Sequence, residues 1–132
     1  MVLKDFYTVL QRSEPEEEVS QSGIPGERYR FMLELNPAHP VYEGHFSGNP
    51  VVPGVCQVQI IGELLSVIKG YGLRLNMADN VKFLTLMVPG RNRVIEAELH
   101  IRATEGGEIA VNATLQQGEV VFIKFKGVYS KE

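Results

Sequence analysis

The stretch YEGHFSGNPVVPGVCQVQIIGE, residues 42–63, decides the fold of this chain and carries its candidate chemistry. It begins as a loop rich in glycine and proline that contains His45, and it then becomes almost entirely apolar. A proline followed by Gly54 is typical of the start of a helix. A loop histidine in front of a buried helix makes His45 a candidate catalytic residue.

The apolar segment predicts one long helix over about residues 54–69, which two nearby glycines end. Apolar residues cover most of its circumference, so the helix is expected to be buried on both sides. At about 100° per residue, Gln59, Glu63 and Ser66 fall within about 60° of one another and form one narrow polar stripe. Only Gln57 lies on the opposite side of the helix.

Most of the remaining sequence alternates between apolar and polar residues, which is typical of half-buried strands. Turn signals rich in glycine and proline separate these stretches. The predicted strands are residues 27–35, 81–88, 94–103, 109–115 and 120–129. One helix and several one-sided strands predict a single α+β domain over residues 1–132, in which a curved antiparallel sheet wraps the helix.

The amino-terminal part has weaker patterns. Residues 5–12 mix aromatic and β-branched side chains and are expected to form a short turn that leads into a strand. The acidic run at residues 14–18 indicates a solvated turn region, and residues 17–20 allow an extended conformation.

Composition and charge exclude several classes of function. The chain has 132 residues, a net charge of −3 and one cysteine, Cys56. Without a basic excess, no nucleic-acid partner is expected. A lone cysteine forms no internal disulfide, and no cysteine and histidine cluster has zinc-site spacing, so we expect a cytoplasmic protein without a structural metal. No run approaches the roughly 18 apolar residues of a membrane span, and the amino terminus does not look like a secretion signal.

The sequence GHFSGNPVVPGV, residues 44–55, resembles the GHFPGxPVxPGV signature of the 3-hydroxyacyl-[acyl-carrier-protein] dehydratases, which have the hot dog fold. It departs from the signature at Ser47, where that family usually has proline. Residues 80–83 and 88–90 also resemble the strand and turn that follow the helix in that family. The resemblance implies a hot dog domain, a hydro-lyase of fatty-acid or related acyl-chain metabolism, and no metal or other cofactor.

The same resemblance assigns roles to individual residues. It implies that His45 is the base that removes the α-proton of a 3-hydroxyacyl thioester, and that the backbone N–H of Gly54 polarises the thioester carbonyl. Phe46, Pro53 and Val55 are implied to contact the substrate beside them.

The family's acid, a Glu or Asp fourteen residues after the histidine, is replaced here by Gln59. Four residues further on, where the family commonly has glutamine, this chain has Glu63. The acid and the amide are therefore exchanged along one helical stripe, and four residues move the carboxylate by about 6 Å.

Three readings stay open. In the first, Glu63 reaches the site directly or through water, Gln59 orients substrate or water, and dehydration is retained. In the second, the protein is a hot dog acyl thioesterase in which both residues position a hydrolytic water. In the third, it is a non-catalytic homologue that binds an acyl carrier. The expected partners are acyl carrier protein or coenzyme A thioesters, and the resemblance implies a homodimer or a higher assembly such as a hexamer.

Other polar residues favour simpler roles. His39 indicates an ordinary loop position, His100 a solvated strand face and Cys56 a small core residue. Five basic residues are candidates for a surface that receives an acidic carrier protein or a pantetheine phosphate. They are Lys82, Arg91, Arg93, Lys124 and Lys126.

Overall fold

The computed structural model describes residues 3–44 and 48–132. In that part of the chain seven strands form one antiparallel sheet, accompanied by two helices. The strands are β1 (Tyr7–Arg12), β2 (Glu16–Val19), β3 (Pro25–Leu35), β4 (Leu73–Phe83), β5 (Val94–Ala103), β6 (Ile109–Gln117) and β7 (Val120–Lys131). The helices are α1 (Val41–Gly44) and α2 (Gly54–Lys69).

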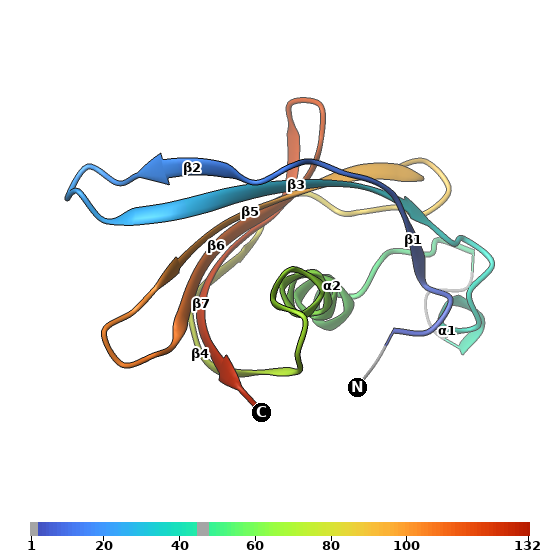
Figure 1. The fold of residues 1–132 in the computed structure, drawn as a ribbon. Coiled ribbons are helices and arrows are strands. Elements are labelled where there is room, and N and C mark those ends of the chain that lie inside the picture. The colour runs from blue at the N-terminus through green and yellow to red at the C-terminus, as the bar shows by residue number, and fades with distance from the viewer. Residues whose placement is uncertain (1–2, 45–47) are drawn as a thin grey trace.

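The sheet has the strand order β1-β3-β5-β6-β7-β4, and β2 pairs with the free end of β3. The sheet curves around α2, which lies along its concave face (Figure 1). The amino-terminal segment and the carboxyl end of β7 lie on either side of the helix. This arrangement confirms the predicted hot dog architecture, and the predicted bounds of the long helix are confirmed as well.

The core lies between the concave face of the sheet and α2. Alternate residues of β3 and β5 face inward and are paired in register, for example Phe31 with Ala97 and Leu33 with Ile95. They meet four fully buried residues of α2, which are Ile60, Ile61, Leu64 and Leu65. Burying each large apolar side chain of this kind contributes about 1.5–3 kcal/mol, so this contact fixes the helix in the sheet.

The prediction that α2 is buried on both sides was wrong for one face. Val55 is 66% exposed and Val67 is 56% exposed. The sheet wraps only part of the helix circumference, so the face that points out of the concave side stays open (Figure 1). The predicted end of the helix is confirmed, because Gly70 adopts a left-handed conformation with φ of 81° and its N–H donates to the carbonyl of Ser66.

The predicted strand at residues 81–88 was wrong in its bounds. The strand in this region, β4, begins at Leu73 and ends at Phe83. It is an edge strand that pairs only with β7, and most of its side chains are exposed, so its sequence lacks the alternation that marks the central strands. Residues 84–88 run as a loop instead, in which the Met87 carbonyl accepts a hydrogen bond from the Val52 N–H.

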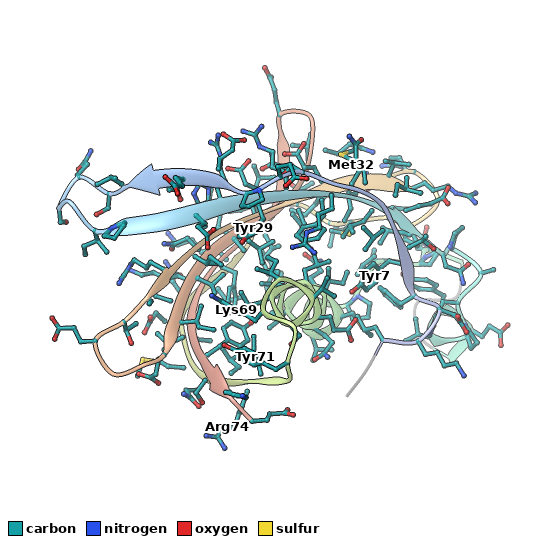
Figure 2. All side chains as sticks on the ribbon, viewed as in Figure 1. Tyr7, Tyr29, Met32, Lys69, Tyr71 and Arg74 are labelled. Atoms are coloured by element: carbon teal, nitrogen blue, oxygen red, sulfur yellow. The ribbon has the colours of Figure 1, made fainter. Side chains whose placement is uncertain are left out.

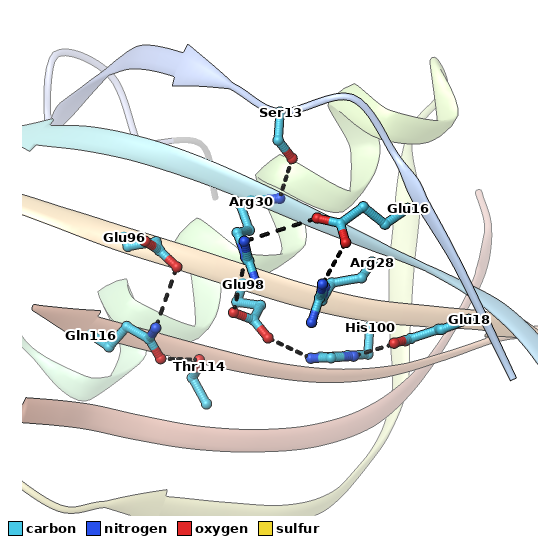
Figure 3. A network of polar contacts seen from close by, with 10 residues as sticks. All are labelled: Ser13, Glu16, Glu18, Arg28, Arg30, Glu96, Glu98, His100, Thr114 and Gln116. Atoms are coloured by element: carbon cyan, nitrogen blue, oxygen red, sulfur yellow. Dashed lines mark hydrogen bonds and ion pairs between the residues drawn. The ribbon is translucent and has the colours of Figure 1, made fainter. Parts of the chain in front are cut away.

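Part of the acidic run forms a strand, because residues 16–19 pair with β3 as β2. The turn expected for residues 14–18 was wrong there, and the extended conformation allowed for residues 17–20 is confirmed for residues 17–19. Opposite charges on neighbouring strands make this possible (Figure 3). Arg28 pairs with Glu16. The ring nitrogens of His100 lie 2.7 Å from Glu18 and 2.8 Å from Glu98.

His100 is therefore not simply solvated, as the sequence had suggested. The two carboxylates that hold it come from different strands, β2 and β5. Glu18 stands opposite Gly26 of β3, where a Cβ atom would lie 2.7 Å from the carbonyl oxygen of Ile101. Separately, no helix among residues 3–44 and 48–132 has the length and the hydropathy that crossing a membrane requires.

Candidate functional site

The amino terminus of α2 is held in place by the loop before it. The side-chain amide of Gln57 donates a 3.2 Å hydrogen bond to the Val52 carbonyl, while the Val52 N–H donates to Met87. These two bonds fix the backbone on both sides of Val52. Gln57 is 4% exposed, so the polar residue on the side of the helix opposite the stripe has a structural role.

The first amides of α2 are only partly satisfied by backbone carbonyls of the described residues. The N–H groups of Cys56 and Gln57 both donate to the Pro53 carbonyl, at 3.0 and 3.1 Å. Within the described part of the chain, the N–H groups of Gly54 and Val55 have no acceptor, and no side chain caps the helix. Unpaired amides at a helix amino terminus attract a developing negative charge. This is the property that the resemblance to the dehydratases requires of the Gly54 N–H.

The ring of Phe83 lies directly against Gly54. A Cβ atom at position 54 would come within 2.6 Å of Cζ of that ring. Glycine is therefore needed for this close approach, and the last residue of β4 covers one side of the helix start.

Gln59 and Glu63 are in contact one turn further along the helix. Nε2 of Gln59 donates a 3.0 Å hydrogen bond to Oε2 of Glu63. A carboxylate can only accept hydrogen bonds, so the NH2 group of the amide must face it. The structure thus brings together the two residues whose order differs from the dehydratase signature.

The carboxylate of Glu63 receives two more hydrogen bonds from the amino-terminal segment. The hydroxyl of Tyr7 donates to Oε1 at 2.9 Å, and the backbone N–H of Leu3 donates to Oε2 at 2.7 Å. Figure 2 shows Tyr7 on β1 beside α2. All three partners of Glu63 are donors, an arrangement that suits the ionised carboxylate.

The environment keeps Tyr7 protonated. Burial raises the pKa of its hydroxyl, and the adjacent negative charge of Glu63 and the hydrogen bond to it raise this pKa further. Tyr7 therefore stays a hydrogen-bond donor over the whole neutral range.

The open face of α2 forms the floor of a groove of about 530 Å³. Gln59, Glu63 and Ser66 lie along this floor, Tyr7 stands on one side, and Leu75 of β4 stands on the other. The polar stripe predicted from the sequence is therefore one surface of a cavity that opens to solvent.

The remaining predicted site residues fall in two groups. Pro53, Gly54 and Val55 lie at the start of α2, about 7 Å along the helix axis before Gln59. His45 and Phe46 lie outside the described residues, so their predicted roles stay predictions.

The other candidate residues have structural roles. His39 accepts the Val41 N–H at Nδ1 and therefore donates from Nε2 to the Lys4 carbonyl, which joins the loop to the amino terminus. Cys56 is 5% exposed and burial raises its pKa, so it behaves as a core residue rather than a nucleophile. In the described ranges no group of three or more histidine, cysteine or acidic side chains is arranged to hold a metal ion.

Three of the five candidate basic residues gather on the convex face. Lys82 of β4 stands opposite Lys124 of β7, and Lys126 follows on the same face. All three are exposed, and none forms an ion pair with an acidic side chain in the described ranges. Arg93 instead pairs with Glu34 at 3.1 Å. We call Lys82, Lys124 and Lys126 the lysine patch.

Sequence reasoning missed the amino-terminal contribution to the site. Tyr7 and Glu63 are 56 positions apart. The contact from Leu3 uses its backbone N–H, so the residue type at position 3 gives no sign of it. A carboxylate on a mostly apolar helix does signal that a partner is required, but it does not say which segment supplies it.

Comparison with known proteins identifies relatives of this chain. Residues 20–122 match the family model described as ApeI-like, ApeI dehydratase. The chain is 35% identical over 91 residues to the 3-hydroxyacyl-[acyl-carrier-protein] dehydratase FabZ of Enterococcus faecalis, an alignment that covers 63% of this chain and 64% of that relative. It is 32% identical over 103 residues to FabZ of Acetivibrio thermocellus, covering 73% of this chain and 70% of the relative. The chain thus spans slightly less than two thirds of the first relative.

Solved structures share the fold over almost their whole length. An uncharacterized protein from Erwinia carotovora superposes with a TM-score of 0.70 at 18% identity, covering 95% of this chain and 96% of the other. The dehydratase heterocomplex ApeI:P from Xenorhabdus doucetiae superposes with a TM-score of 0.63 at 19% identity, covering 94% and 97%. These likenesses support the predicted hot dog fold.

Proposed function

Because the chain belongs to the ApeI-like dehydratase family, we propose that it dehydrates 3-hydroxyacyl thioesters to 2-enoyl thioesters. The observation that carries this proposal is the arrangement along α2. Two amides at the helix start, which have no acceptor among the described residues, lie on the same helix as the Gln59–Glu63 pair, and this pair lines an open groove.

In the proposed reaction the Gly54 N–H polarises the thioester carbonyl, which makes the α-proton acidic. His45 removes that proton, and hydroxide leaves from the β-carbon with its electron pair as the double bond forms. Gln59 donates a hydrogen bond to the departing oxygen. The proton held by His45 then passes to the hydroxide, so water is released and the histidine returns to its neutral form.

A thioesterase is the second candidate, and a specific contact favours it. In the described part of the chain, three donors hold the two oxygens of Glu63 in place. A fixed carboxylate beside a groove could position and activate a water molecule for attack on the thioester. We place dehydration first because the family match supports it.

We propose that the working form is a homodimer joined through β4. This strand is an edge of the sheet, and it exposes Leu75 and Met77, the latter at 58%. Pairing with a second β4 would satisfy its free backbone groups and cover these side chains. It would also provide a further wall for the groove, since Leu75 already lines that groove.

We propose that the carrier of the acyl group is an acidic carrier protein that docks on the lysine patch. Lys82 directly precedes Phe83, whose ring lies against Gly54, so the patch adjoins the start of α2 around the edge of the sheet. The protein as a whole carries a net charge of −3, so attraction of an acidic partner must come from a local concentration of unpaired cations. We expect this reaction in the cytoplasm, where the free thiol of Cys56 would stay reduced.

The test uses the purified protein and a 3-hydroxybutyryl thioester, on coenzyme A and on acyl carrier protein. Formation of the 2-enoyl product, followed by absorbance and mass, supports the proposal if His45→Ala abolishes it. Release of free thiol without an enoyl product would support the thioesterase instead. Binding of the acylated carrier without any turnover would show a non-catalytic homologue and overturn both enzymatic proposals.

A further inference from the structure

We propose that Tyr7 is a positioning residue of this site, which acts through Glu63 to orient Gln59. This inference rests on the proposed function, because it concerns the residue at the position of the family's acid. Tyr7 itself is not required to touch the substrate.

The first step is the chain of hydrogen bonds. Tyr7 Oη donates to one oxygen of Glu63, at 2.9 Å, and Gln59 Nε2 donates to the other, at 3.0 Å. The Leu3 N–H donates to the same oxygen as Gln59, at 2.7 Å. The carboxylate is thus held from two sides by the amino-terminal segment before it meets Gln59.

The second step concerns what the held carboxylate does to the amide. Gln59 must present its NH2 group to Glu63, because an ionised carboxylate donates nothing. One N–H of the amide is therefore committed, and the direction of the other is fixed by the planarity of the group.

The third step explains why a tyrosine serves this purpose. Tyr7 is only partly exposed, and its burial together with the charge of Glu63 keeps the phenol protonated. It is therefore a permanent donor to Oε1. Replacing it with phenylalanine removes the donor that holds Oε1, so the carboxylate and the Gln59 amide bonded to it lose one of their fixed points.

The sequence around Tyr7 offers a matched control. Tyr29 on β3 also donates to a glutamate, Glu27, at 3.4 Å, but this pair does not line the groove. Tyr7→Phe and Tyr29→Phe each remove one hydroxyl whose hydrogen bond to a carboxylate is partly buried. Only the first change affects the hydrogen bonds that link the amino-terminal segment to Gln59 through Glu63.

The experiment compares the parent, Tyr7→Phe, Tyr29→Phe and Glu63→Gln in the dehydration assay. We expect Tyr7→Phe to lower kcat by about tenfold with little change in KM. Tyr29→Phe should match the parent in both quantities. If Glu63→Gln loses activity while Tyr7→Phe keeps the parent's kcat, the inference about Tyr7 is overturned and the proposed function stands.

A second measurement does not depend on turnover. The side-chain NH2 signals of Gln59 in ¹⁵N-correlated NMR spectra, assigned through their loss in Gln59→Ala, should shift and broaden in Tyr7→Phe. They should stay in place in Tyr29→Phe. Unchanged Gln59 signals in a folded Tyr7→Phe variant would contradict the inference. An inactive parent whose Gln59 signals respond to Tyr7→Phe would overturn the proposed function and leave the positioning contact in place.

Discussion

The hydroxyl of Tyr7 donates a 2.9 Å hydrogen bond to Oε1 of Glu63, and so joins the first strand of the sheet to the middle of the central helix. This bond closes a chain segment of more than fifty residues. It also holds the amino-terminal segment over the face of α2 that the sheet leaves open.

We therefore predict that Tyr7→Phe destabilises the fold by about 2 kcal/mol, the typical worth of a hydrogen bond to a charged group. Urea unfolding followed by circular dichroism measures this change. Tyr29→Phe is the control and should cost less, because its hydrogen bond to Glu27 is longer, at 3.4 Å. Equal losses in the two variants would mean that the Tyr7 contact has no special strength.

A second prediction concerns alkaline pH. Burial raises the pKa of both Tyr42 and Tyr129 to about 12, against a usual value of 10.0. The folded state therefore holds these protons more tightly than the unfolded state, so their contribution to stability is complete below pH 10 and is lost as the pH rises towards 12.

Urea midpoints measured between neutral and strongly alkaline pH test this. The free energy of unfolding should decline above pH 10, and Tyr129→Phe should show a shallower decline than the parent. Because the Tyr129 hydroxyl is buried and has no hydrogen-bond partner among residues 3–44 and 48–132, this variant should lose little stability at neutral pH. A flat stability curve across this range would contradict the prediction.

The third prediction concerns the side-chain contacts of His100 that help hold β2. His100 lies between Glu18 and Glu98, and all three side chains are partly exposed. His100→Ala should therefore cost no more than about 1 kcal/mol globally. It should nevertheless speed amide hydrogen exchange in residues 16–19, while the amides of β5 keep their protection. Arg93→Ala, which breaks the separate pair with Glu34, is the control and should leave residues 16–19 unaffected.

The fourth prediction concerns the only thiol. Cys56 is 5% exposed and its pKa is raised by burial, so little reactive thiolate is available. A chromogenic thiol reagent at mildly alkaline pH should modify Cys56 at least about tenfold more slowly than it modifies a short cysteine peptide. Urea should abolish the difference. Fast modification of the folded protein would show that Cys56 is more accessible than its packing indicates.

The sequence predicted the parts of the fold that depend on local periodicity. The bounds of α2 follow from its long apolar run between a proline and a glycine. The bounds of β5 follow from a regular alternation of apolar and polar residues over its whole length. The strand predicted at residues 81–88 was misplaced because β4 is an edge strand whose side chains are mostly exposed. Such a strand does not need alternating apolar and polar residues. The open face of α2 was missed because apolar residues such as Val55 remain on it, and periodicity does not show which face a sheet will leave uncovered.

The candidate site was predictable to a similar degree. The helical spacing of Gln59 and Glu63 predicts that they share a face, and they are in contact. The partners of Glu63 could not be predicted, because they lie 56 and 60 positions away. Their contacts depend on how the amino-terminal segment and β1 pack beside α2 in the folded chain. His100 was misjudged for the same reason, since Glu18 reaches it from a different strand.

The central claim is that the site works with Gln59 at the position of the family's acid. The most direct test is the initial rate of 2-enoyl thioester formation by the parent and by Gln59→Glu, measured side by side at saturating substrate. We predict that the parent turns over and that the two rates differ by less than about tenfold. An inactive parent, with activity appearing in Gln59→Glu on the scale of the 10²- to 10⁴-fold that a general acid typically contributes, would contradict the account.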